Sequence, residues 1–156
     1  MQAQTNDGQW RAALTIWGVV NCVNVLQTVG FLSRVPSGSM VVNHLLGYVI
    51  VALAIPSVIA LIAFFRSRAS WRQWIGPAVF LAFVLFMAVV DYVWQVEFRS
   101  PPRPAILAPY LTLFFGSILL MGIPMYRLNR KLWAVTAGTT VLLLGSMGIA
   151  MVNGVG

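Results

Sequence analysis

The chain has 156 residues, of which 60% are hydrophobic and 8% are charged, and its mean hydropathy is +0.86. A soluble domain carries roughly 25% charged residues, so this composition excludes a soluble globular protein. The formal net charge of +7 does not indicate nucleic-acid binding, because the basic residues lie in short segments between apolar runs, where membrane topology and anionic headgroups account for them.

Five apolar runs are long enough to cross a bilayer as helices. Each has about 21–23 residues, which as a helix spans about 32–35 Å, against a hydrocarbon core of about 30 Å. Helices are expected because unpaired backbone groups are very unfavourable in lipid, and the alternating pattern of a barrel strand is absent. We therefore predict an all-α, single-domain, integral membrane five-helix bundle, with spans at about residues 12–32, 44–65, 74–96, 105–126 and 132–152.

Prolines and small residues punctuate these runs. Pro56 lies in the middle of the second run and is expected to kink it. The third and fourth runs are separated by Ser100, Pro101, Pro102 and Pro104, and these residues can also begin the fourth helix. Small residues recur every four positions in the second run, and a second set shares one face of the fifth. We expect both faces to pack within the bundle, and the alternative is an interface between copies of the chain. The two sets are Ala52, Pro56 and Ala60, and Ala134, Gly138 and Gly145, with Gly148 nearby.

The charges between the runs predict the orientation. Cytoplasmic loops of membrane proteins carry an excess of Lys and Arg. An N-terminus on the cytoplasmic side places seven basic residues inside and three outside. We therefore predict a cytoplasmic N-terminus and an outside C-terminus, in a multi-pass protein of the cell (inner) membrane. The inside set is Arg11, Arg66, Arg68, Arg72, Arg127, Arg130 and Lys131, and the outside set is Arg34, Arg99 and Arg103.

Polar residues within the spans gather in the half that this orientation places outside. Asn21, Asn24 and Thr28 follow i, i+3, i+7 spacing and so share a helix face. The inner halves of the second and third spans are almost wholly apolar. We predict a polar cavity open to the outer face. The candidate ligand-binding residues are Asn21, Asn24, His44, Tyr48, Asp91, Gln95, Glu97 and Arg99.

Asp91 is the most informative of these candidates. The chain has only three acidic residues, and an ionised carboxylate at the centre of a span costs on the order of 2.5–3.5 kcal/mol. Asp91 should therefore face the bundle and find a partner. We interpret it as lining a ligand, ion or proton site; the alternative is a structural hydrogen-bonding residue. For Glu97 and Arg99 we favour an interfacial pair, and for His44 a helix cap or an interfacial position. Hydrogen bonds between helices alone could explain the two asparagines.

The sequence identifies no cofactor, catalytic residue or metal site. Its single histidine, His44, excludes a multi-histidine metal site within one chain, and its single cysteine excludes an intrachain disulfide. We expect a protein that binds or transports a small molecule, ion or lipid headgroup. The alternatives are an accessory subunit of a larger membrane complex and an intramembrane enzyme acting on a lipid or quinone-like substrate. The expected partners are membrane lipids and another membrane subunit or a second copy, not nucleic acid.

Overall fold

The computed structural model describes residues 7–96, 98 and 103–154, and every regular element within these ranges is a helix. Five spans are long and apolar enough to cross a membrane, which confirms the predicted all-α five-helix membrane bundle. The second span consists of two helices, and the third ends in a π-helix. In chain order the elements are α1 (Asp7–Ser37), α2 (Val41–Ala52), α3 (Ala54–Arg66), α4 (Trp71–Met87), η1 (Ala88–Val93), α5 (Pro104–Leu128) and α6 (Arg130–Val152).

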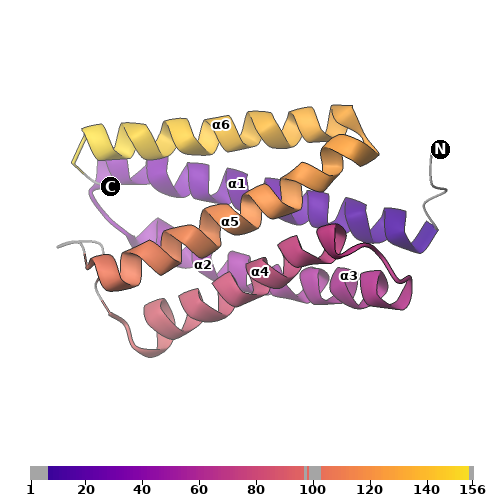
Figure 1. Ribbon diagram of the computed structural model, residues 1–156. Coiled ribbons are helices and arrows are strands. Elements are labelled where there is room, and N and C mark those ends of the chain that lie inside the picture. The colour runs from indigo at the N-terminus through magenta and orange to yellow at the C-terminus, as the bar shows by residue number, and fades with distance from the viewer. Residues whose placement is uncertain (1–6, 97, 99–102, 155–156) are drawn as a thin grey trace.

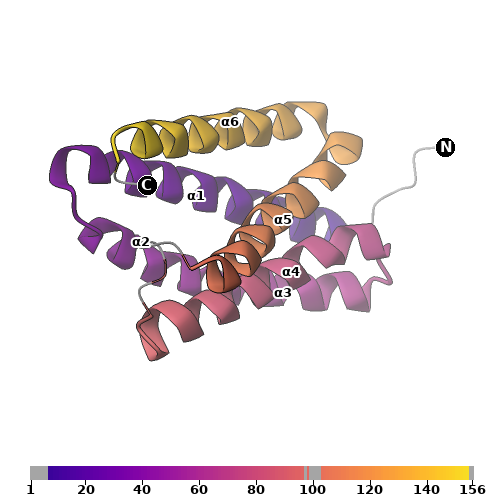
Figure 2. The same cartoon turned by 60° about the vertical axis from the view of Figure 1, so that its left-hand side comes forward.

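The five spans form a closed ring. α1 packs against α6 on one side and against α2 and α3 on the other, α4 packs between α3 and α5, and α5 meets α6 (Figures 1 and 2). The N-terminus lies at one end of the bundle and the C-terminus at the other (Figure 1). We call the first the basic end, because it carries the basic residues of the turn between α3 and α4 and of the corner between α5 and α6. We call the opposite end, where α1 ends and α2 begins, the cavity end, because a cavity lies there.

α1 is longer than predicted, and this corrects the placement of Arg34. The helix has 31 residues, about 46 Å at 1.5 Å per residue, and ends only at Ser37. Arg34, which the sequence places in the first loop, therefore lies within the helix and is only 5% exposed. The connection to α2 is short, and Gly38 supplies its left-handed residue with φ +60°.

The second span breaks where Pro56 predicts a kink. Proline cannot donate a hydrogen bond to the carbonyl four residues earlier, which here belongs to Ala52. α2 ends at this residue, and the amide of Leu53 is shared between the carbonyls of Val49 and Ile50, at 3.1 and 3.2 Å. The span therefore consists of two helices that meet at Leu53. α5 begins at Pro104, one residue before the predicted start of the fourth span, and Pro104 is one of the residues expected to begin this helix.

The third span ends three residues earlier than predicted. Its last turn is the π-helix η1, in which the amide of Trp94 donates to the carbonyl of Val89 over 2.8 Å. Gln95 is the second residue after the helix and has φ +50°, a left-handed conformation in which a right-handed helix cannot continue. Gln95 is therefore outside the helix and exposed, and the prediction that it lies within the third span is wrong.

The apolar core runs through the middle of the ring toward the basic end. Val20 and Val23 of α1 are fully buried there, as are Phe80 and Phe83 of α4. Phe83 also contacts Phe114 of α5, with their ring centres 5.3 Å apart. Most large apolar residues on the outer faces of the helices remain exposed, as expected for side chains that meet lipid.

The small residues of α6 do not pack within the bundle. Gly138, Gly145 and Gly148 are exposed, and a Cβ atom added at any of them would meet no atom within 4 Å. Ala134 is exposed on the same helix. The expectation of intramolecular packing is therefore wrong for this face, because α6 turns its threonines toward α1 instead. In the second span only Ala60 of the predicted set is buried.

Gly76 offers a direct test of the packing between α4 and α5. A Cβ atom at this position would lie 2.7 Å from the backbone of Leu120 and Met121, which cannot move independently of α5. We expect Gly76→Ala to lower the free energy of unfolding by about 1–3 kcal/mol, measured by thermal melting in detergent. Gly138→Ala is the matched control, because its Cβ would enter open space. Equal melting temperatures for the two variants would contradict this close approach.

Candidate functional site

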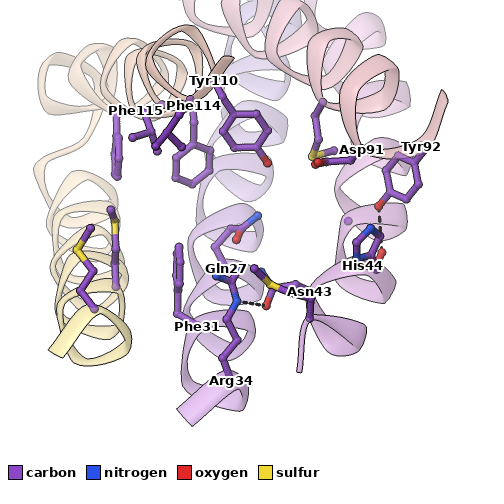
Figure 3. Close-up of a pocket in the computed structure, with 17 residues that line it drawn as sticks. Gln27, Phe31, Arg34, Asn43, His44, Asp91, Tyr92, Tyr110, Phe114 and Phe115 are labelled. Atoms are coloured by element: carbon purple, nitrogen blue, oxygen red, sulfur yellow. Dashed lines mark hydrogen bonds between the residues drawn. The ribbon is translucent and has the colours of Figure 1, made fainter. Parts of the chain in front are cut away.

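A cavity of about 260 Å³ lies at the cavity end of the bundle (Figure 3). All five spans contribute to it, so it depends on the whole ring. One group of lining residues is polar or charged and the other is apolar. The polar group is Gln27, Arg34, Asn43, His44, Asp91, Tyr92 and Tyr110, and the apolar group is Phe31, Met40, Gly47, Met87, Leu107, Leu111, Phe114, Phe115, Met147 and Met151.

Arg34 joins α1 to the start of α2. Its Nε donates to Oδ1 of Asn43 over 3.1 Å, and its guanidinium lies 4.8 Å from the ring centre of Phe31 (Figure 3). Gly30 permits this contact, because a Cβ atom there would lie 2.8 Å from the same Asn43 oxygen. Gln27, Phe31 and Arg34 follow i, i+4, i+7 spacing, so α1 presents one continuous face to the cavity.

Tyr92 connects the second and third spans. Its hydroxyl donates to the backbone carbonyl of His44 over 3.0 Å, and its ring meets the His44 ring edge-on at 6.0 Å. Tyr48 stacks on the same tyrosine with ring centres 4.6 Å apart. The hydroxyl lies directly against Gly47, which has no side chain to obstruct it. Three aromatic side chains and one glycine therefore fix η1 against α2.

Asp91 lies in the π-helix and lines the cavity close to His44 (Figure 3). A π-helix bonds residue i to residue i−5 and so accommodates one more residue than an α-helical turn, which changes the direction of the side chains in it. Single turns of this kind recur at functional sites. The carboxyl group is thus placed on the cavity wall by an irregular turn rather than by the regular spacing of α4.

The apolar wall is formed mainly by α5 and α6. Phe114 and Phe115 of α5 contact each other at 5.0 Å and line the cavity (Figure 3), and Met147 and Met151 of α6 line it too. Tyr110 lies one turn earlier and packs on Phe83 at 5.3 Å. Methionine is flexible and polarisable, so this wall can adapt to apolar groups of different shape.

Asn21 and Asn24 lie elsewhere, at the interface of α1 and α6. Nδ2 of Asn21 donates to Thr136 over 3.0 Å, and Nδ2 of Asn24 donates to Thr139 and Thr140, also over 3.0 Å. Thr139 returns a hydrogen bond to Oδ1 of Asn21 at 2.8 Å. The two asparagines do share one helix face, as their spacing predicts, but that face meets α6 and not the cavity.

The structure thus brings together only part of the predicted site. Asp91 and His44 line the cavity, whereas Tyr48 and Gln95 are exposed beside it and do not line it. Glu97 and Arg99 lie outside the described residues. The polar lining residues absent from the predicted set are Gln27, Arg34, Asn43, Tyr92 and Tyr110.

A signal for most of these five was present in the sequence. Gln27, Asn43, Tyr92 and Tyr110 are polar residues in the same half of their spans as Asp91. No such signal marked Arg34, because the sequence places it in the loop after the first span. Only the structure shows that α1 extends far enough to include it. No group of three or more His, Cys, Asp or Glu side chains that could hold a metal ion occurs in the part of the chain that the structure describes.

Comparison of the chain with protein family models, with curated proteins and with solved structures finds no significant match. Inference about function therefore starts from the cavity.

The contact between Gly47 and Tyr92 can be tested by a double-mutant cycle. We expect Gly47→Ala to lower the free energy of unfolding by about 1–3 kcal/mol, because the new methyl group overlaps the Tyr92 hydroxyl. In a Tyr92→Phe background the same substitution should lower the free energy of unfolding by less, because the obstructing hydroxyl oxygen is absent. Thermal melting of the four proteins measures the coupling. Additive changes in the free energy of unfolding would show that a methyl group at position 47 does not overlap the Tyr92 hydroxyl.

Proposed function

We propose that this protein binds a small amphipathic molecule in the cavity. The observation that carries the proposal is the two-sided lining. Arg34, Asn43, His44 and Asp91 can hydrogen-bond a polar group, while the phenylalanines and methionines of the same lining can contact an apolar one. A molecule with both characters satisfies both walls at once.

The apolar wall makes a simple ion pathway the weaker candidate. Ion pathways are lined by carbonyl groups or rings of charged side chains, whereas ten of the seventeen residues around this cavity are apolar. The volume of about 260 Å³ is slightly below the roughly 300–1,000 Å³ of typical ligand pockets. It suits a headgroup, a ring or a short chain rather than a whole phospholipid.

The charge distribution supports a cavity that faces the outer side of the membrane. Six exposed basic residues surround the turn between α3 and α4 and the corner between α5 and α6, at the opposite end. By the positive-inside rule that end is cytoplasmic, and the cavity then takes its ligand from the outer leaflet or the outer aqueous phase. Binding alone, or binding as one step of transport, would both use this site.

A cavity-filling substitution tests the proposal. Leu111 lines the cavity, whereas Leu119 lies two turns further along α5 and is 56% exposed on the outer face. The protein is extracted from its native membrane in a mild detergent, and native mass spectrometry detects bound small molecules. We expect an adduct on the wild type and on Leu119→Trp, and none on Leu111→Trp. An adduct retained by Leu111→Trp, or absent from the wild type, would contradict binding in the cavity.

Asp91→Asn refines this test without changing the shape of the site. A hydrogen bond to a charged group contributes about 1.5–3 kcal/mol, so occupancy should fall by about tenfold or more at limiting ligand. The melting temperature of the protein without ligand reports separately on folding. Unchanged occupancy would remove Asp91 from the binding site while leaving the cavity itself intact.

An accessory subunit is the second candidate, and the exposed glycines of α6 favour it. Small residues let helices approach closely in a membrane, and this face has no partner among the described residues. We expect Gly145→Leu to abolish a dimer or a complex that the wild type forms, as measured by light scattering of the purified protein. Ile149→Leu, on the same helix, is the conservative control. A wild type that remains monomeric at all concentrations and co-purifies with no other subunit would contradict this candidate.

A further inference from the structure

The basic end of the bundle carries exposed positive charge that comes from two separate segments. Three arginines surround the turn from α3 to α4, and three basic residues surround the corner from α5 to α6. Both segments are held against α1. Gln9 donates to the carbonyl of Ser67 over 3.0 Å, and the Trp17 indole donates to the carbonyl of Leu132 over 2.9 Å. We call the six residues the basic collar: Arg66, Arg68, Arg72, Arg127, Arg130 and Lys131.

The charges of the basic collar are not neutralised by the described part of the protein. All six side chains are exposed, and no ion pair joins any of them to an acidic residue within the described ranges. Asp7 is the only described acidic residue at this end, since Asp91 lies at the cavity end. A cluster of like charges repels itself unless counter-charges are near. The neutralising anions must therefore come from outside the described part of the chain.

Neighbouring aromatic residues place the basic collar at the depth of lipid headgroups. Arg72 lies 5.8 Å from the ring centre of Trp71, and Arg130 lies 5.4 Å from that of Tyr126. Tyr126 in turn packs on Trp133 at 5.1 Å. Exposed tryptophan and tyrosine favour the boundary between membrane and water. The charges therefore meet the membrane surface, rather than projecting into water toward a soluble nucleic acid or protein.

Helix stability explains only the positions of Arg66 and Arg127, which lie in the last turns of α3 and α5, where the helix dipole favours cations. Arg72 is in the first turn of α4, and Arg130 and Lys131 are in the first turn of α6, where neither helix has an acidic residue. The positive end of the helix dipole disfavours cations there. An external anion would relieve this repulsion and the mutual repulsion of the side chains together.

We propose that the basic collar binds anionic phospholipids, with their phosphate groups between the arginine side chains and their acyl chains along the exposed apolar faces of α3 and α5. Ile62 of α3 and Ile123 of α5 are exposed about one turn deeper than Arg66 and Arg127, and they provide that apolar contact together with the exposed Phe65 beside Arg66. This site is separate from the cavity, which lies at the other end of the same helices.

The experiment uses the full chain in nanodiscs of phosphatidylcholine and phosphatidylglycerol in equal parts. Because both leaflets have the same composition, the orientation of the protein does not affect the result. Native mass spectrometry of the released protein counts each bound lipid. We expect the wild type to be enriched in phosphatidylglycerol, and the enrichment to weaken as the salt concentration rises.

Two triple variants and one control locate the site. Each basic residue near a membrane surface contributes a factor of about five to the binding of anionic lipid. We therefore expect Arg127→Gln, Arg130→Gln and Lys131→Gln together to reduce the enrichment at least about tenfold. The corresponding change of Arg66, Arg68 and Arg72 tests the other segment independently, should either variant fail to fold. Arg103→Gln removes an exposed charge at the cavity end and should leave the enrichment unchanged.

Three results would overturn the proposal. The first is a wild type with no preference for phosphatidylglycerol. The second is a preference that survives in both triple variants, or that Arg103→Gln removes equally. The third is a wild type that shows no lipid preference but retains fluorescent polyglutamate in pure phosphatidylcholine nanodiscs, which would assign this end to an acidic protein partner.

Discussion

Lipid offers no water to a polar group, and this constraint decides how the polar residues of the bundle are used. The two asparagines of α1 find their partners in the threonines of α6. Arg34 bonds to Asn43, and Tyr92 bonds to the His44 carbonyl. Each of these bonds joins two different helices, so each one fixes how a pair of spans is rotated. Polar residues in a membrane therefore set the arrangement that apolar packing alone would leave undetermined.

The two interruptions of regular helix both lie in the spans that form the polar wall. The break at Leu53 separates the cavity half of the second span from the half in the core, and the π-helix ends the third span beside Asp91. Irregular backbone at membrane depth is tolerated where protein or a cavity surrounds it. Tyr92 then joins these two spans through its bond to His44. The irregular backbone and the polar lining thus belong to the same part of the molecule.

The sequence predicts the bundle well because hydropathy and helix length depend only on the chain and the bilayer. It predicts the cavity less well because the rotation of each helix depends on its neighbours. Asn21 and Asn24 share a face as predicted, yet which helix that face meets is a property of the whole ring. Gln95 departs from prediction because a π-helix cannot be recognised from spacing, and Arg34 because the helix extends past the hydrocarbon core.

Three features that each destabilise a membrane protein coincide at the cavity. An ionisable carboxyl group within a span is unfavourable, and a π-helix is far rarer than an α-helix. A cavity leaves its lining residues with fewer packing contacts. Asp91 belongs to all three, because it lies in the π-helix and lines the cavity. A purely structural polar residue needs neither a π-helix nor a cavity. The asparagines of α1 show this, because they lie in regular helix and bond directly to α6. A bound molecule adds packing contacts to the cavity wall, and the π-helix directs the carboxyl group toward that molecule, so their coincidence favours a binding site over a structural one.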